Sequence, residues 1–134
     1  FFSESVIAGP LGSFIDVICF SPNTKIKLSS GQYKIMKDIC LGEILEDGSE
    51  VKAVLRIKGN SDTPYYKIYS KKLNEYIYVT GSHLIMDPKT NKFIKVETFE
   101  NAEICEEWGE ELSCLITSTN KIPIGEYTFW DWED

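Results

Sequence analysis

Short segments in which polar and apolar residues alternate run through almost the whole chain, and turn-forming residues separate them. A period of two places every second side chain on the same face, as in a half-buried β-strand. This pattern predicts strands at residues 25–28, 32–36, 51–57, 65–69, 76–80, 83–86, 93–96, 112–117, 121–124 and 127–132. No stretch keeps helical periodicity over the ~11 residues of an average helix. The chain is therefore predicted to be all-β, with short hairpins in a curved or disc-like arrangement.

The segments between these strands carry the expected turn residues. Ser-Ser-Gly at 29–31 and Asp-Gly at 47–48 are hairpin signals. Residues 39–45, which include Gly42, indicate a short turn that leads into a strand. Residues 100–111 are acidic and irregular, and no element is predicted there.

Composition limits the classes of protein and partner. The chain has 134 residues, 43% of them hydrophobic, which is enough for one core without a second domain. Its 14 basic and 21 acidic residues leave a net charge of −7, which argues against nucleic acid or an anionic membrane as a partner. The apolar stretch at 1–18 is broken by polar residues well short of the ~20 that a membrane span requires. We predict a flanking segment at 1–18, a domain at 19–134 and no membrane span.

The four cysteines do not suggest a metal site. Cys19, Cys40, Cys105 and Cys114 have no CxxC spacing, and His83 is the only histidine, so the usual zinc ligand sets cannot be completed. No metal and no cofactor are expected. A chain of this length does not need disulfides to fold, so we expect mostly free thiols, with two disulfides left open for an oxidising compartment.

Cys19 stands where the apolar flanking segment meets the β domain, and His83 ends a Thr-Gly-Ser-His tetrad after a predicted strand. An ionised thiol is the best peptide-bond nucleophile among side chains. The Ile18 carbonyl is one residue away, so attack by Cys19 would give a thioester through a five-membered ring, with no second molecule needed. His83 is the natural proton carrier near neutral pH for the departing nitrogen. Thr80, three residues before it, could hold the amide.

Each of these residues also has an ordinary structural interpretation. A cysteine in a small β domain is commonly a buried apolar residue, and a lone histidine is commonly a surface residue. Thr-x-x-His also occurs by chance in many proteins. The catalytic interpretation therefore depends on the rest of the pattern.

Three groups of residues, taken in order, resemble the Hint (Hedgehog/intein) domain. Cys19-Phe20, the strand at 24–28, the glycine turn at 30–31 and the segment at 35–45 resemble its opening, which has an initiating cysteine and a V-x-D-L-x-x-G-D-x-V segment. Residues 80–84 resemble its TxxH motif. Residues 112–116, Leu-Ser-Cys-Leu-Ile, resemble the S-C-Y-A-V segment of Hedgehog autoprocessing domains, and the last strands are similar in layout to those of inteins.

The resemblance implies a fold and a chemistry. The fold is an all-β, Hint-type disc or horseshoe of short irregular hairpins with pseudo-two-fold character. The chemistry is an N-to-S acyl shift in which Cys19 is the nucleophile, the Ile18–Cys19 bond is cleaved, and Thr80 and His83 assist departure of the amide nitrogen.

Other cysteines are interpreted through the same resemblance. Cys114 matches a Hedgehog-type cysteine near the active site, with a core strand cysteine as the alternative. Cys40 and Cys105 match no catalytic position and are expected to be packing residues.

Three more polar residues are candidate accessory groups. Asp62 could take the place of the aspartate by which Hedgehog-type domains activate an external hydroxyl, or it is an ordinary loop acid. Asn120 lies where some intein-like tails carry a histidine, or it is a turn residue. Asp134 could replace the terminal asparagine of inteins, or it is a solvated tail residue. Because the tail reads Trp-Glu-Asp rather than His-Asn, N-terminal cleavage or transfer is expected rather than full protein splicing.

These features favour an autocatalytic, single-turnover domain. Cys19 would attack the Ile18 carbonyl, and the flank would then pass to water, a thiol or another nucleophile. The partners implied are a covalently attached N-terminal flanking protein and a small nucleophile as acceptor. One alternative is an inactive or arrested Hint-like domain that serves as a structural or binding module. A weaker one is a trans-acting cysteine protease whose site its own flank would fill.

Overall fold

A computed structural model describes residues 4–7 and 18–132, and in this part of the chain regular structure consists of strands and two short 3₁₀ helices. The strands are β1 (Glu4–Ile7), β2 (Lys25–Lys27), β3 (Tyr33–Ile35), β4 (Val51–Lys58), β5 (Tyr65–Ser70), β6 (Glu75–Thr80), β7 (Leu84–Asp87), β8 (Lys92–Lys95), β9 (Ala102–Ile104), β10 (Glu111–Thr117), β11 (Lys121–Ile124) and β12 (Tyr127–Trp130). The 3₁₀ helices are η1 (Met36–Asp38) and η2 (Val96–Thr98). The fold is all-β, as the alternation predicts.

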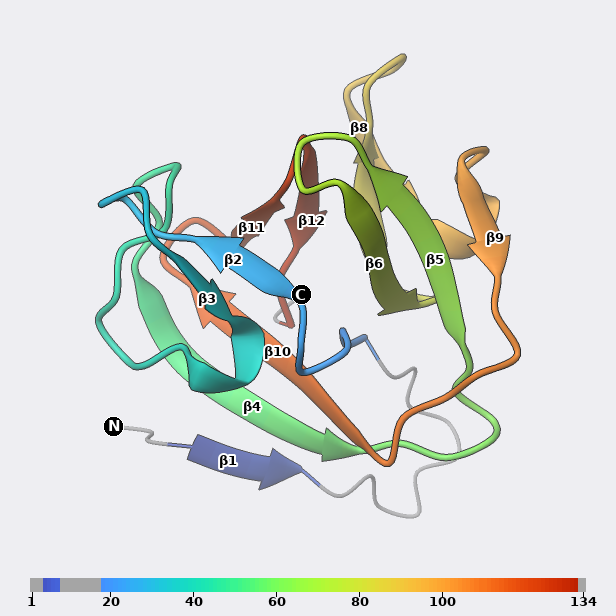
Figure 1. The fold of residues 1–134 in the computed structure, drawn as a ribbon, viewed down its shortest axis with the longest axis horizontal. Coiled ribbons are helices and arrows are strands. Elements are labelled where there is room, and N and C mark those ends of the chain that lie inside the picture. Colours follow the sequence, from blue (N-terminus) through green and yellow to red (C-terminus); the bar gives the residue numbers. More distant parts are fainter. Residues whose placement is uncertain (1–3, 8–17, 133–134) are drawn as a thin grey trace.

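The strands form four small sheets that curve around a shared interior (Figure 1). Their orders are β1-β4-β10, β6-β5-β9, β11-β12-β7-β8 and the hairpin β2-β3. The pair β1–β4 is parallel, whereas the long pair β4–β10 is antiparallel. Because no sheet has more than four strands, each one closes only part of the interior, and the core is shared among all of them.

The same strand-to-turn unit occurs twice. β3 leads directly into η1, and β8 leads directly into η2. Met36 and Val96, which open the two helices, are fully buried, and Ile39 and Phe99, which follow them, are almost fully buried. The amide of Ile39 donates to the carbonyl of Met36, as that of Phe99 does to Val96. Such a repeat is what pseudo-two-fold character requires.

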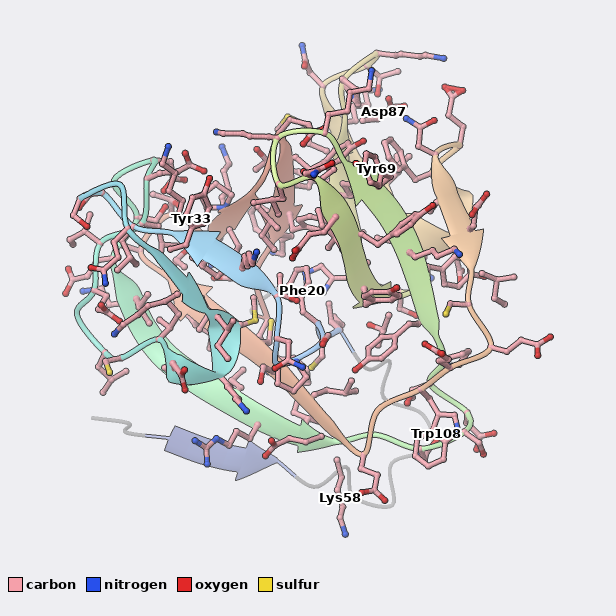
Figure 2. All side chains as sticks on the ribbon, viewed as in Figure 1. Phe20, Tyr33, Lys58, Tyr69, Asp87 and Trp108 are labelled. Atoms are coloured by element: carbon pink, nitrogen blue, oxygen red, sulfur yellow. The ribbon has the colours of Figure 1, made fainter. Side chains whose placement is uncertain are left out.

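The core brings the start of the domain to the centre of the molecule. Phe20 and Phe129 are the largest fully buried side chains, and aliphatic residues from the surrounding sheets pack around them. Figure 2 shows Phe20 in the middle of the molecule, while Tyr33, Lys58 and Trp108 lie at its periphery. Burying a phenylalanine side chain is worth roughly 1.5–3 kcal/mol, so the residue after Cys19 anchors this end of the domain.

Most predicted strands are confirmed within one or two residues, and the differences have physical causes. β9 lies in the acidic segment where no element was predicted, because pairing with β5 supplies what local propensity does not. Residues 39–45 contribute only isolated bridges rather than a strand. In the flanking segment, residues 4–7 form β1, while 1–3 and 8–17 lie outside the described residues.

The cysteines are free thiols, but one of the packing predictions was wrong. Cys40 is exposed, because it lies in the turn after η1, where its amide donates to the Glu43 carboxylate at 2.8 Å. Cys105 is half-buried and packs at the edge of the core.

Candidate functional site

Residues 19–21 form a short bridge between β6 and β10. Phe20 exchanges both backbone hydrogen bonds with Ser113 of β10, at N···O distances of 2.8 and 2.9 Å. On the other side, the carbonyl of Cys19 accepts the N–H of Thr80 at 2.9 Å. The backbone that follows the Ile18–Cys19 bond is therefore fixed by strands on both sides.

Thr80, the last residue of β6, forms a second hydrogen bond with Cys19 through its side chain. Its Oγ1 accepts the N–H of Cys19 at 3.0 Å, and this nitrogen belongs to the Ile18–Cys19 peptide bond. Both partners are buried, and a hydrogen bond in such an environment is stronger than in water. A hydroxyl thus lies at the nitrogen that an N-to-S acyl shift would release.

The tight turn after Thr80 carries His83 into the interior. The N–H of His83 donates to the carbonyl of Thr80 at 3.2 Å, which closes the turn. At Gly81 an added Cβ would lie 2.7 Å from Cε1 of Tyr66, so the turn uses the small residue to pass that ring. The imidazole is fully buried and packs against Phe20, with ring centroids 4.3 Å apart.

The two ring nitrogens of His83 have different environments. Nε2 lies 2.5 Å from the carbonyl oxygen of Trp130. Because a carbonyl only accepts, Nε2 carries the hydrogen and Nδ1 carries the lone pair. Among the described residues, Nδ1 has no hydrogen-bond partner. Burial lowers the pKa of His83 from 6.5 to about 4, although the bond to Trp130 opposes this. His83 is therefore neutral at pH 7, unlike a solvated histidine, which titrates near that pH.

Cys114 lies directly across from Cys19. Because Phe20 and Ser113 form a hydrogen-bonded pair, Cys19 and Cys114 form the next, non-hydrogen-bonded pair, in which side chains approach most closely. Both thiols are fully buried. Burial, followed by the Cys114 thiol, raises the pKa of Cys19 well above its usual value, while a backbone hydrogen bond of Ile18 lowers it. The thiol thus faces Cys114, while the imidazole packs on the neighbouring Phe20.

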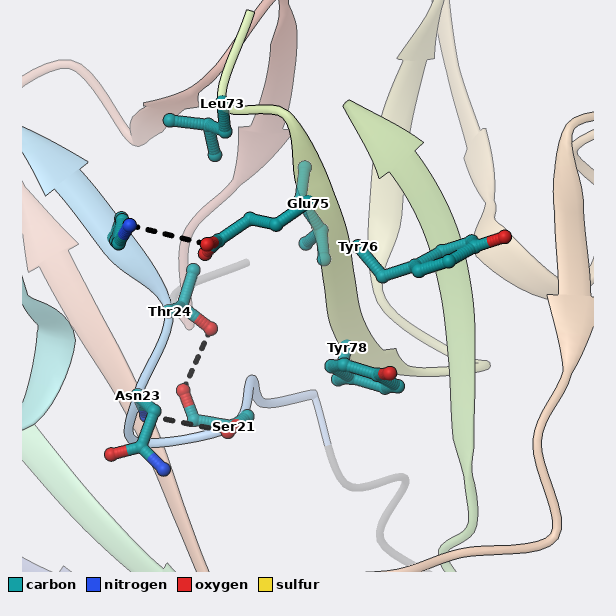
Figure 3. Close-up of a pocket in the computed structure, with 9 residues that line it drawn as sticks. Ser21, Asn23, Thr24, Leu73, Glu75, Tyr76 and Tyr78 are labelled. Carbon is teal, nitrogen blue, oxygen red and sulfur yellow. Dashed lines mark hydrogen bonds and ion pairs between the residues drawn. The ribbon is translucent and has the colours of Figure 1, made fainter. Parts of the chain in front are cut away.

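A pocket of about 430 Å³ opens beside this bridge, but it does not contain the reacting groups. Ser21, Thr24 and residues of β6 line it, as Figure 3 shows. Lys25 and Glu75 form an ion pair across it, with Nζ and Oε1 3.2 Å apart. Cys19, Thr80 and His83 are not among its lining residues, so the site is closed off within the part of the chain that the structure describes.

The three other polar candidates, Asp62, Asn120 and Asp134, differ in where they lie. Asp62 is exposed in a loop, where its amide donates to Asn60 Oδ1 at 2.7 Å, and no contact shown for it reaches Cys19, Thr80 or His83. Asn120 lies in the turn between β10 and β11 with a φ of 64°, as the turn alternative predicts. Asp134 lies outside the described residues.

Sequence reasoning missed Asp131. This carboxylate is fully buried and accepts the N–H of Thr117 at 2.9 Å. It also follows Trp130, whose carbonyl is the partner of His83. The signal in the sequence was the alternation in the last strand, which points Phe129 and residue 131 to the same inward side. An acid at such a position requires hydrogen-bond partners.

The comparisons with known proteins bear on the fold. No protein-family model matches the chain, and no curated protein matches it either. Solved structures do match. The DnaB intein from Synechocystis sp. PCC 6803 superposes with a TM-score of 0.64 at 14% sequence identity, over 87% of this chain and 100% of that chain. The gp41-1 intein superposes with a TM-score of 0.59 at 16% identity, over 85% of this chain and 98% of that chain.

A third solved structure agrees with these two. The Ssp DnaB Mini-Intein variant M86 superposes with a TM-score of 0.61 at 15% identity, over 90% of this chain and 99% of that one. The chain therefore has the intein-like Hint fold that its motifs predict. At these identities the similarity shows the fold alone. Separately, the described residues include no helix long and apolar enough to cross a membrane.

Proposed function

We propose that the chain is a self-processing domain that converts the Ile18–Cys19 peptide bond into a thioester. The observation that carries this proposal is the pair of hydrogen bonds between Thr80 and Cys19. In one of them the Cys19 N–H donates to Thr80 Oγ1, and this bond holds the nitrogen that must leave. The fold supports the proposal, since the solved structures that it resembles are inteins. Cleavage or transfer of the flank is the outcome we expect.

Formation of the thioester requires no reactant from outside the chain. The Cys19 sulfur adds to the Ile18 carbonyl carbon, the carbon–nitrogen bond breaks, and the nitrogen becomes the free α-amine of Cys19. One proton moves from the thiol to that nitrogen. Water or an added thiol then attacks the thioester, releases residues 1–18 and regenerates the Cys19 thiol. The domain turns over once, because its substrate is its own flank.

His83 is suited to carry the proton in two steps. Its Nδ1, for which the described residues supply no partner, first accepts the thiol proton. Cys19 does not lose this proton by itself, because its pKa is raised by burial. Because the pKa of His83 is about 4, its neutral ring is a weak base, and the protonated ring forms only transiently. For the same reason the protonated ring is a stronger acid than an ordinary imidazolium and gives its proton readily to the departing nitrogen. Thr80 keeps that nitrogen in place meanwhile.

Intact mass tests the proposal directly. The chain is incubated with dithiothreitol or hydroxylamine, and release of residues 1–18 is followed with time. We expect release from the wild-type chain and none from Cys19→Ala, while His83→Ala should slow it by at least ~10²-fold, a typical scale for losing a general acid–base group. Cys40→Ala, which removes an exposed thiol, is the matched control and should behave as wild type. Equal release from the wild-type chain and Cys19→Ala would reject the assignment.

One observation favours an arrested, non-processing module as the second candidate. The Cys19 thiol is 0% exposed, and its raised pKa keeps it protonated. In addition, β1 of the flanking segment pairs with β4, which ties the flank to the domain. A wild-type chain that stays whole in both reagents would favour this candidate.

A further inference from the structure

Both polar groups of the peptide between Trp130 and Asp131 form hydrogen bonds, and these bonds fix its orientation. Its carbonyl oxygen accepts Nε2–H of His83 at 2.5 Å. Its N–H donates to the carbonyl of Asn120 at 3.0 Å. The orientation of this one peptide group therefore determines whether His83 has an acceptor at Nε2.

The Asp131 carboxylate anchors that peptide group to the turn between β10 and β11. Oδ2 accepts the N–H of Thr117 at 2.9 Å, and Nδ2 of Asn120 lies 3.4 and 3.3 Å from the two carboxylate oxygens. Asp131 is 0% exposed, so its carboxyl group requires hydrogen bonds such as these in place of water. Asn120 has a left-handed backbone conformation, which its contact with the carboxylate helps to hold.

The aromatic rings around the imidazole of His83 restrict its rotation. The ring lies against Phe20 and 5.8 Å from the ring of Phe129, to which it is nearly perpendicular. A ring flip would exchange the positions of the nitrogens and carbons and remove Nε2 from the Trp130 carbonyl. The ring therefore keeps its orientation as long as that carbonyl keeps its own.

We propose that Asp131 is a positioning residue for His83. By holding the Trp130 carbonyl, it keeps the imidazole as the Nε2–H tautomer and leaves the Nδ1 lone pair to receive a proton. Orientation of a catalytic base by a third group is a general feature of nucleophilic sites. The catalytic consequence rests on the proposed function, whereas the effect on the tautomer does not.

The tautomer can be measured without any reaction. His83 is the only histidine of the chain, so the ¹⁵N–¹H spectrum of the imidazole reports this one ring. Cys19→Ala is used as the parent because it keeps the flank attached. At pH 7 the parent should show the Nε2–H tautomer alone, and adding Asp131→Ala should give a mixture of the two tautomers.

Two further variants serve as controls in this background. Asp131→Asn keeps an oxygen that can accept the Thr117 amide and should stay close to the parent. Asp47→Ala removes an exposed turn carboxylate that accepts the Ser49 amide, and it should match the parent spectrum. If Asp131→Ala does not fold, Asn120→Gly replaces it, since glycine accepts the positive φ but lacks the amide that contacts Asp131. A pure Nε2–H tautomer in the folded test variant would overturn the inference.

With Cys19 restored, the rate of thiol-induced release completes the test. Asp131→Ala should slow release by at least about 10-fold at pH 7, part of the loss expected when a general base is removed entirely, and Asp131→Asn should recover most of it. An altered tautomer with an unchanged rate would overturn the positioning role. A chain that releases no flank while the tautomer still depends on Asp131 would reject self-processing and leave the structural part of the inference supported.

Discussion

The ring of Phe20 packs at 4.3 Å on the imidazole of His83, so the residue after the candidate nucleophile removes the candidate base from water. Phe129 meets Phe20 edge-on, with centroids 5.0 Å apart, and completes the apolar enclosure. Burial of this kind disfavours the imidazolium form. The same contact thus places the chain's only histidine against the residue that follows Cys19 and makes it neutral at physiological pH.

Stability should therefore fall in mild acid. The unfolded chain binds a proton at His83 with the ordinary pKa of 6.5, whereas the folded chain does so only at about 4. The contribution of neutral His83 to the free energy of unfolding is complete above pH 6.5. It decreases as the pH falls below that value and is lost by about pH 4. It amounts to roughly 3 kcal/mol, at 1.36 kcal/mol for each pH unit between the two values. Urea unfolding at several pH values between 7.5 and 4 measures it.

His83→Gln provides the control for this prediction. Glutamine does not titrate, so the variant should lack the part of the pH dependence that His83 causes, even if it is less stable at every pH. The comparison uses the slope of unfolding free energy against pH and not its absolute value. Parallel curves for the wild-type chain and His83→Gln would contradict burial of a neutral imidazole.

The rate of release should have a distinctive pH profile. If Nδ1 of His83 accepts the thiol proton, the rate depends on neutral His83 and protonated Cys19, and both persist from about pH 5 to 8 because the pKa of His83 is about 4 and that of Cys19 is well raised. We expect a plateau over this range when hydroxylamine is saturating. In His83→Ala only the thiolate can attack, so the rate should rise about tenfold for each pH unit.

The two chains must be compared under the same conditions. Intact mass at several times and pH values gives both profiles. A wild-type rate that rises as steeply as that of His83→Ala would show that the imidazole does not take the thiol proton, and it would leave Thr80 as the main contributor.

Sequence alone was sufficient for most of the strands, because strands leave a local pattern of alternating polar and apolar residues. Cys19, Thr80 and His83 were proposed as site residues from residue type and order, and the structure joins Thr80 to Cys19 by a hydrogen bond. The partner of His83 could not be found in this way, since it is a backbone carbonyl, and every residue has one. Nor could β1 or β9, because their pairing depends on strands distant in the chain.

The oxygen of Thr80 is expected to matter more than its shape. Thr80→Val keeps a branched side chain but removes Oγ1, so the Cys19 N–H loses its acceptor in a buried site. An unsatisfied buried donor costs about 1–3 kcal/mol, which urea unfolding would detect, and release should slow by roughly tenfold or more if that cost falls on the reacting amide. Thr80→Ser retains the hydroxyl and should recover most of both losses. Equal behaviour of the two variants would show that Oγ1 is not used.

The turn that carries His83 should not tolerate a larger residue at position 81. In Gly81→Ala the new Cβ would lie 2.7 Å from Cε1 of Tyr66, so either the ring or the turn must move. Overpacking of this kind typically costs 1–3 kcal/mol, and movement of the turn would also displace His83 and slow release. Tyr66→Ala removes the obstructing ring, so the double variant should be more stable than the sum of the two single changes predicts. Additive free energies of unfolding in this cycle would mean that the Tyr66 ring moves aside without destabilising the fold. Gly81 would then not be needed to position His83.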